Sequence, residues 1–199
     1  NMRIIGLCGR SGSGKTTAAQ TFRRLGCDII DADEVARAVM GAGSPCLSEL
    51  SEQFGNDIIR ADGTLDRKLL ASRAFCDREK AALLNSITHK YIVREIDNRI
   101  NTSDAGNIII DAPLLFEAGL QEKCSAIIGV IAPDTVCVER AAKRDGITEE
   151  EVEHRLRNQH GNDYLLTYCT HILNNSGTVE ELDSKAAVLL NQITGGNDA

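Results

Sequence analysis

Short apolar runs rich in isoleucine and valine recur along the chain, and segments with the spacing of amphipathic helices separate them. Such runs are typical of strands that are buried on both faces of a parallel sheet. The helical segments are typical of the crossovers that join parallel strands. The pattern therefore predicts an α/β fold with a parallel sheet. The predicted strands are Ile4–Cys8, Cys27–Ile30, Asn107–Ile110, Ile127–Ile131 and His171–Leu173.

Apolar spacing and end signals place three of the helices. The first helix is predicted to stop at Gly26, because glycine is common just past a helix end. Two later helices are predicted to open at the capping boxes Thr148–Glu151 and Thr178–Glu181. The residues expected on the buried face of the first helix are Ala18, Ala19, Phe22 and Leu25. Those expected on the last helix are Leu182, Ala186, Leu189 and Ile193.

The segment from Asp66 to Ile100 contains no strand candidate. Its apolar residues recur every four positions, which is typical of one face of a helix. They are Leu83, Ile87 and Tyr91, followed by Ile92, Ile96 and Ile100. The segment predicts an insertion of two or more helices between the second and third strands. Since no repeat or linker divides the sequence, we expect one domain with two helical outgrowths.

Composition and charge narrow the class of protein. The 199 residues are 42% hydrophobic and 26% charged, which is the balance of a soluble globular protein. A net charge of −7 disfavours non-specific binding to nucleic acid or to a membrane surface. No apolar run approaches membrane-spanning length, and Ile4–Cys8 is too short for the core of a signal peptide. We expect a cytoplasmic protein without nucleic-acid or membrane partners; a monomer is expected, and an oligomer stays open.

The chain contains seven cysteines, which are scattered and never form C-x-x-C. An odd number without metal-ligand spacing favours reduced thiols in the cytosol over a disulfide framework or a zinc site. The cysteines are Cys8, Cys27, Cys46, Cys76, Cys124, Cys137 and Cys169.

The stretch Gly9–Thr16 matches the phosphate-binding loop pattern G-x-x-x-x-G-K-[ST], with a buried strand before it and an amphipathic helix after it. Its glycines let backbone N–H groups converge on phosphate oxygens, and Lys15 adds a full charge. The Thr16 hydroxyl is the expected protein ligand of Mg²⁺ that binds together with ATP. The alternative is a chance glycine-rich turn. The residues expected to bind ATP are Gly9, Ser11, Gly12, Ser13, Gly14, Lys15, Thr16, Thr17, Arg140 and Asn175.

Two carboxylates, Asp31 and Asp33, follow the second predicted strand. In an extended chain residues two apart share a face, so both are expected to point the same way. Because the second strand of a parallel β-α-β unit ends at the same sheet edge as the phosphate loop, an acid there could accept a proton or help to hold Mg²⁺. The alternative is that Asp33 only caps the next helix.

A cluster of cations follows the fourth predicted strand in this acidic chain. Its members are Arg140, Lys143, Arg144, Arg155 and Arg157, on two helices joined by a turn at Asp145. Guanidinium groups suit a lid that closes over a phosphoryl group in transfer, and Arg140 is the expected phosphate contact. The alternative is a solvated face that pairs with Glu149–Glu151 and Glu153.

An apolar strand that ends in Asp111 fits a Walker-B-like acid, which could orient Mg²⁺ through a water molecule. A strand that ends in a turn-forming aspartate is the alternative.

Together these stretches resemble the dephospho-CoA kinase family, from Ile5 to Leu182. The segment Asp111–Glu117 is the most specific match, because the phosphate loop alone is shared by many families. The matching stretches are Gly6–Leu7 with Gly9–Thr17, Ile30–Asp33 with Ala36–Arg37, Phe54–Gly55, Asp62–Arg67, Leu84–His89, Asp111–Glu117 with Gly119–Leu120, Arg155 with Gln159, and Asn175 with Gly177.

The resemblance implies phosphoryl transfer from ATP to the ribose 3′-hydroxyl of dephospho-CoA. It implies a P-loop kinase core with a five-stranded sheet (2–33, 106–134 and 163–195), a helical CoA-binding domain (34–105) and a lid (135–162). The catalytic residues would be Asp33 as the base, Lys15 and Arg140, and Asn175 would lie at the adenine of ATP. The implied acceptor-binding residues are Asp33, Arg37, Leu65, Arg67, His89, Pro113, Leu114 and Glu117.

The chain departs from the family pattern at two positions. The family usually begins its loop with Gly-Gly-Ile, where this chain has Arg10 and Ser11 after the first glycine. We expect Arg10 to point to solvent. The family's His-Pro is here His89 followed by Lys90, so we expect the helix to continue through this point.

Two other readings of the motifs differ in class. One is another small-molecule P-loop kinase, which would act on a nucleoside monophosphate or a sugar acid. The other is a nucleotide-dependent switch or binding module. A GTPase would need Asn-Lys-x-Asp, and a transporter-type ATPase would carry Leu-Ser-Gly-Gly-Gln; the sequence contains neither.

Overall fold

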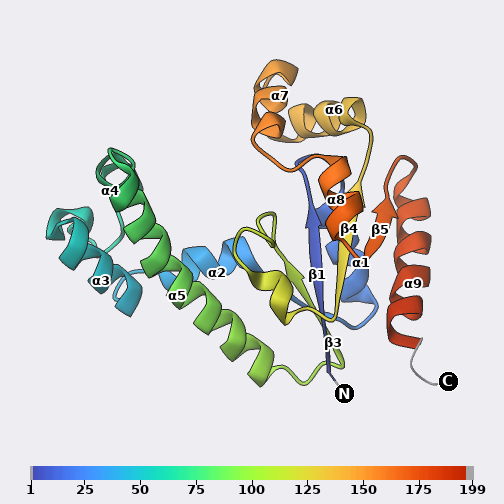
Figure 1. The fold of residues 1–199 in the computed structure, drawn as a ribbon, viewed down its shortest axis with the longest axis horizontal. Helices are drawn as coiled ribbons and strands as arrows, with labels where there is room; N and C mark the ends of the chain where they lie inside the picture. The colour runs from blue at the N-terminus through green and yellow to red at the C-terminus, as the bar shows by residue number, and fades with distance from the viewer. Residues whose placement is uncertain (1, 196–199) are drawn as a thin grey trace. The chain divides into compact units, whose positions relative to one another are not determined.

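The computed structural model describes residues 2–195 and contains a five-stranded parallel sheet with the order β2-β3-β1-β4-β5 (Figure 1). The strands are β1 (Arg3–Gly9), β2 (Asp28–Asp31), β3 (Asn107–Asp111), β4 (Ala126–Ile131) and β5 (His171–Asn174). Each predicted strand is confirmed to within one residue at either end. The predicted fold class is therefore confirmed.

Two compact units make up the chain. One contains the residues up to Ile30 together with those from Asp104 onward, and the other is Asp31–Ser103. The sequence placed a substrate-binding domain at 34–105 and a lid at 135–162. Those assignments concern ligands and stay predictions.

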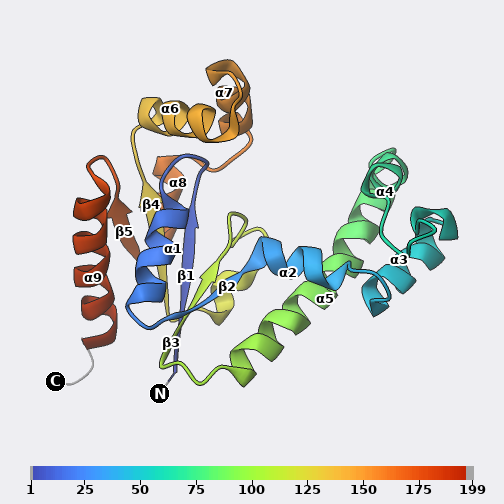
Figure 2. The ribbon, with the colours of Figure 1, turned by 180° about the vertical axis from the view of Figure 1, so that it is seen from behind.

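The larger unit buries an apolar core between its sheet and two helices, α1 (Lys15–Arg24) and α9 (Val179–Gly195). Figures 1 and 2 show α1 on one face of the sheet and α8 (Asn162–Tyr168) on the other. Phe22 of α1 is completely buried in this core. The fully buried strand residues around it include Ile5, Leu7, Ile109, Ile128 and Val130.

One residue predicted for the buried face of the first helix is misplaced. Ala18, Ala19 and Phe22 are buried as expected, but Leu25 is 46% exposed. The reason is that α1 ends at Arg24, and the chain turns away at Gly26 with a φ of +88°. Gly26 is thus confirmed as the stop signal, and Leu25 lies just beyond the helical repeat.

A helical hairpin follows β4 and consists of α6 (Asp134–Asp145) and α7 (Glu149–Arg157). The predicted capping box of α7 is confirmed. Thr148 Oγ1 accepts a hydrogen bond from Glu151 N at 3.2 Å, and the Glu151 carboxylate accepts one from Thr148 N at 2.8 Å. The hairpin has a small core of its own. Its buried members are Ala132, Cys137, Val138, Ala141, Val152 and Leu156.

The smaller unit is helical, as predicted for the insertion. Its elements are α2 (Ala32–Val39), α3 (Pro45–Phe54), the 3₁₀ turn η1 (Asn56–Ile58), α4 (Arg67–Ala74) and α5 (Arg78–Thr102). The predicted stripe on α5 is partly right, since Ile87, Ile96 and Ile100 are buried while Leu83 is 37% exposed. Helix α5 continues through Lys90, as the missing proline predicted.

Another 3₁₀ turn, η2 (Leu120–Lys123), lies between β3 and β4 in the larger unit. None of the helices within residues 2–195 has the length and apolar character needed to span a bilayer.

Candidate phosphate-binding site

The turn between β1 and α1 has the backbone that the phosphate-loop motif predicts. Gly12 and Gly14 have φ angles of +79° and +93°, which side-chain-bearing residues rarely adopt. A Cβ at Gly12 would also collide with the backbone carbonyl of Cys137 in α6. Gly14 is the N-cap of α1 and provides no side-chain cap, so the first N–H groups of α1 are left for an anion.

The side chain of Lys15 donates a hydrogen bond to Asp111 Oδ1 at the end of β3. Both side chains are largely buried, with 17% of Lys15 and 11% of Asp111 exposed. The sheet order explains the pairing, because β1 and β3 are neighbours and both end at this edge. An ammonium group and a carboxylate therefore lie together beside the loop, as a phosphate site with a Walker-B-like acid requires.

Two amide side chains that are remote in sequence hold the phosphate loop. Asn175, which is only 6% exposed, donates from Nδ2 to Ser13 O at 2.8 Å. Gln159 accepts from Ser11 N at 2.9 Å through its Oε1 atom. Sequence reasoning placed Asn175 at adenine and gave Gln159 no role at the loop. The position of both amides after the hairpin of α6 and α7, in stretches that resemble the family pattern, was the signal for their importance.

The expectation that Arg10 points to solvent is wrong. Its side chain is only 9% exposed, and Nη1 pairs with Asp134 Oδ1 at 2.7 Å at the start of α6. Nη2 lies 3.4 Å from the carbonyl oxygen of Leu156 near the end of α7. The hairpin supplies acceptors on both sides of the guanidinium group, so the long Arg10 side chain packs against the hairpin instead of extending into solvent.

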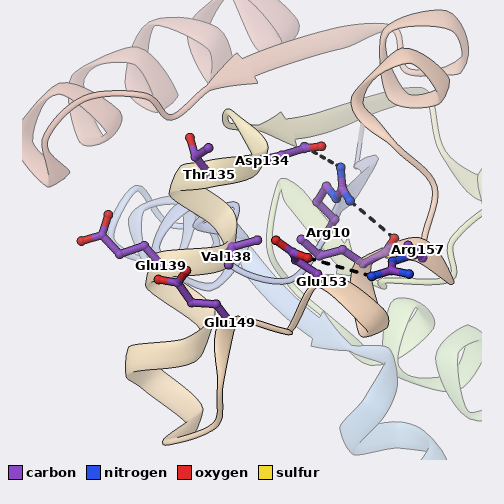
Figure 3. A pocket seen from close by; sticks show the side chains of 9 residues that line it. Arg10, Asp134, Thr135, Val138, Glu139, Glu149, Glu153 and Arg157 are labelled. Atoms are coloured by element: carbon purple, nitrogen blue, oxygen red, sulfur yellow. Dashed lines mark hydrogen bonds and ion pairs between the residues drawn. The ribbon is translucent and has the colours of Figure 1, made fainter. Parts of the chain in front are cut away.

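Arg10 also lines a pocket of about 530 Å³ against the hairpin (Figure 3). Figure 3 shows its guanidinium between Asp134 and the α7 backbone, with acidic side chains from both helices around the opening. The remaining lining residues are Thr135, Val138, Glu139, Glu149, Glu153, Leu156 and Arg157.

Each arginine of the predicted cation cluster has a partner within the protein. Arg140 donates to Asn175 O at 2.9 Å and lies 3.4 Å from Gly177 O, so it holds the turn after β5. Arg144 and Arg155 both pair with Asp145, and these guanidinium groups lower the pKa of that carboxyl. Of the acids proposed as alternative partners, Glu153 lies 3.9 Å from Arg157.

Arg144 also reaches the loop, since its Nη2 lies 3.3 Å from Ser11 Oγ. Lys143 is exposed. The hairpin thus brings Arg140 to the turn that carries Asn175 and brings Arg144 to the loop itself.

In the smaller unit, the expectation that Asp31 and Asp33 share a face of an extended chain is wrong, and so is the alternative that Asp33 caps the next helix. Asp31, not Asp33, caps α2, because its Oδ1 accepts from Asp33 N at 2.9 Å and from Glu34 N at 3.0 Å. Asp33 does not lie in an extended chain but in the first helical turn, where it is exposed. The helix begins at Ala32, directly after the end of β2 at Asp31, so the two carboxylates do not alternate as in a strand.

The acceptor-binding residues predicted in the smaller unit are not all gathered together. Leu65 and Arg67 line one pocket of about 730 Å³. Arg37 and His89 are exposed and lie outside its lining. Leu65 is itself 8% exposed and packs in the apolar core of this unit. The other lining residues are Arg60, Asp66, Lys68, Leu69 and Ser72.

In the larger unit, Pro113 and Leu114 are exposed in the turn after β3, and Glu117 accepts a 2.8 Å bond from His160 Nε2. The His160 ring stacks on Tyr164 with centroids 3.6 Å apart. The sequence analysis missed this aromatic cluster, which also includes Phe116 and Tyr168. Its signal was the spacing of four residues between the rings on α8.

The chain is similar to known proteins over nearly its whole length. The family model described as dephospho-CoA kinase matches residues 3–181. A curated dephospho-CoA kinase from Corynebacterium glutamicum is 41% identical over 195 residues, which are 96% of this chain and 98% of the relative.

Solved structures share the fold. A crystal structure from Thermus thermophilus matches with a TM-score of 0.82 and 31% identity, over 98% of this chain and 100% of that one. A structure titled dephospho-CoA kinase from Campylobacter jejuni matches with a TM-score of 0.71 over 98% of both chains. At 22% identity, the second likeness concerns the fold alone.

Proposed function

The chain belongs to the dephospho-CoA kinase family, and we propose that its phosphate loop, Asp33 and Arg140 transfer the γ-phosphoryl group of ATP to the ribose 3′-hydroxyl of dephospho-CoA. The products are coenzyme A and ADP. One observation carries the proposal: a phosphate loop with Lys15 against Asp111 stands in a chain that matches the family from residue 3 to residue 181.

The phosphate loop binds and orients the donor. Its glycine backbone and the first N–H groups of α1 face the phosphates. When ATP binds, Lys15 directs part of its hydrogen bonding away from Asp111 and toward the outer phosphate oxygens. Charge that develops on the migrating group is then stabilised by donors already in place, which is the largest contribution to phosphoryl transfer.

The oxygen donors beside the loop fit Mg²⁺. Thr16 exposes its hydroxyl in the first turn of α1, and the Asp111 carboxylate lies at Lys15. Mg²⁺ usually takes one or two protein oxygens and leaves its other positions to phosphates and water. Within residues 2–195, no group of three or more His, Cys, Asp or Glu residues is arranged to hold a metal. When bound with ATP, Mg²⁺ would neutralise charge on the phosphates.

Asp33 is proposed to align the acceptor hydroxyl and to take its proton. Asp31 already caps α2, so the Asp33 carboxylate is exposed and is not needed for the helix start. Its position two residues after β2, a strand of the parallel sheet, supports a place at the carboxyl edge, where ligands of such sheets bind.

Arg140 and its neighbours on α6 are proposed to act on the donor phosphates. Arg140 is tied to the turn at Asn175, and Asn175 is tied to Ser13 in the loop. This chain of hydrogen bonds joins the hairpin to the phosphate site. A guanidinium group so placed would stabilise the transferring phosphate and help to exclude water.

A coupled assay of ADP release tests the function. We expect ADP release to depend on dephospho-CoA, and to be much slower with a nucleoside monophosphate or a sugar acid as acceptor. Equal turnover with one of those acceptors would favour another small-molecule kinase. Turnover independent of any acceptor would favour a nucleotide switch.

A second prediction concerns Arg67, which lines the pocket of the smaller unit and is proposed to bind the acceptor. Arg67→Ala is expected to raise the KM for dephospho-CoA about tenfold, because a charge-assisted bond to a substrate phosphate is lost, while the KM for ATP is kept. Arg78→Ala is the matched control, since Arg78 is exposed at the start of α5 and lies outside this lining. A parallel change in both KM values would contradict an acceptor role for Arg67.

A further inference from the structure

Two cysteine thiols lie in contact directly beside the phosphate loop. Cys8 is the residue before Gly9 in β1, and Cys169 follows the end of α8. Their sulfur atoms are 3.5 Å apart, although the residues are 161 positions apart in sequence. Within residues 2–195, no other two cysteine sulfurs are in hydrogen-bond contact. The mechanism proposed above uses neither thiol.

A glycine in the central strand lets the two thiols meet. Gly129 of β4 is the register partner of Cys8 in β1. Cys169 lies over Gly129, because a Cβ at that position would come within 2.8 Å of its sulfur. Any larger residue at position 129 would displace the Cys169 side chain. The missing side chain at Gly129 therefore leaves room on this face of the sheet for Cys169 beside Cys8.

The two thiols differ in exposure and acidity. Cys8 is 2% exposed, whereas Cys169 is half-buried between the exposed residues Tyr168 and Thr170. A hydrogen bond from the Cys8 thiol lowers the pKa of Cys169. The same contact and burial raise the pKa of Cys8. Cys169 is thus the more accessible and the more acidic of the two thiols, and Cys8 is the buried, less acidic thiol next to it.

The remaining cysteines lack this arrangement. Burial raises the pKa of Cys46 and of Cys124 to about 11, which disfavours the reactive thiolate. Cys76 is exposed, and it lies in the smaller unit.

We propose that Cys8 and Cys169 form a redox modification site, which a peroxide converts to an intramolecular disulfide that weakens nucleotide binding. The Cys169 thiolate attacks hydrogen peroxide, so an S–O bond forms, the O–O bond breaks, and the departing hydroxide becomes water with the proton that the thiol released. The Cys8 sulfur then attacks the sulfenic sulfur. The S–S bond forms, the S–O bond breaks, and the leaving hydroxide takes the Cys8 proton as a second water.

Disulfide formation would strain the phosphate loop. The sulfur atoms would have to close from 3.5 Å to the length of an S–S bond, about 2 Å. Cys169 lies outside any helix or strand, whereas Cys8 lies in β1 and adjoins Gly9. Gly9 is closely packed, because even a Cβ there would come within 2.7 Å of Ser13 Oγ and 2.9 Å of the Val130 carbonyl oxygen. Movement of Cys8 would therefore reach the loop.

Peptide mapping and calorimetry test the site. The starting protein is the full chain with Cys76→Ser, which removes the exposed thiol and with it intermolecular disulfides. After treatment with hydrogen peroxide and alkylation, we expect a digest peptide that links Cys8 to Cys169 and disappears with dithiothreitol. We also expect ADP affinity to fall about tenfold and to return on reduction. The same protein with Cys169→Ala, or Cys169→Ser if alanine prevents folding, should show neither change.

Each result bears on a separate part of the inference. The absence of the linking peptide, or its replacement by a Cys169 sulfinic acid, would overturn the disulfide. A linked protein with unchanged ADP affinity would overturn the effect on the loop. That second part rests on the proposed function of the phosphate loop, whereas the linking peptide does not. Failure of the reduced protein to bind ADP would overturn the loop assignment, and the effect on the loop with it.

Discussion

Replacing Lys15 by alanine is expected to lower kcat/KM for ATP by on the order of a thousandfold. The lost group is the only full positive charge within the phosphate-loop motif after Arg10, whose guanidinium is engaged by the hairpin. Both binding and turnover should suffer, because Lys15 is proposed to contact phosphate before and during transfer. Steady-state kinetics with varied ATP, and calorimetry with ADP, separate the two effects.

The same substitution has a structural consequence that must be separated from catalysis. Lys15→Ala removes one side of an ion pair with Asp111, whose side chain is only 11% exposed, and loss of a largely buried ion pair is destabilising. The double variant Lys15→Ala with Asp111→Asn removes both charges and is expected to recover stability without activity. Lys80→Ala is the matched control, because Lys80 is an exposed lysine of α5. Normal kinetics in Lys15→Ala would discredit the loop assignment.

Local pattern was sufficient for the elements that position the site. A buried strand such as β1 requires a run of apolar residues. A positive φ, as at the helix end at Gly26 and in the phosphate loop at Gly12, favours glycine. These features can therefore be recognised in the sequence. The capping box of α7 is equally local, since Thr148 and Glu151 are three residues apart.

Contacts between distant residues were beyond such patterns. Arg10 and Asp134 are 124 positions apart, and Asn175 is 162 positions from Ser13. No spacing rule connects such pairs, and only the docking of the hairpin and of the turn after β5 brings them together. The capping residue of α2 was not predicted correctly, for a different reason. Asp31 and Asp33 are both good caps, and whether the helix begins at Ala32 or at Glu34 decides between them.

Asp33→Asn is expected to lower kcat by on the order of a hundredfold or more, with the KM for ATP largely kept. The amide preserves the shape of the side chain and can still align a hydroxyl, but it cannot take the proton. The helix start should be intact because Asp31 provides the cap, so circular dichroism and the melting temperature should match those of the unmodified protein. The loss should therefore appear in the chemical step alone.

Two neighbouring substitutions decide whether the effect belongs to Asp33. Glu34→Gln, in the same helical turn, removes an exposed carboxylate that pairs with Arg99 at 3.1 Å, and it should leave kcat near its normal value. Asp31→Asn keeps a capping side chain and removes its charge. If Asp31→Asn lost turnover while Asp33→Asn kept it, the proton acceptor would be the capping residue. Because asparagine caps a helix as well as aspartate does, a loss in Asp31→Asn could not be attributed to the helix start.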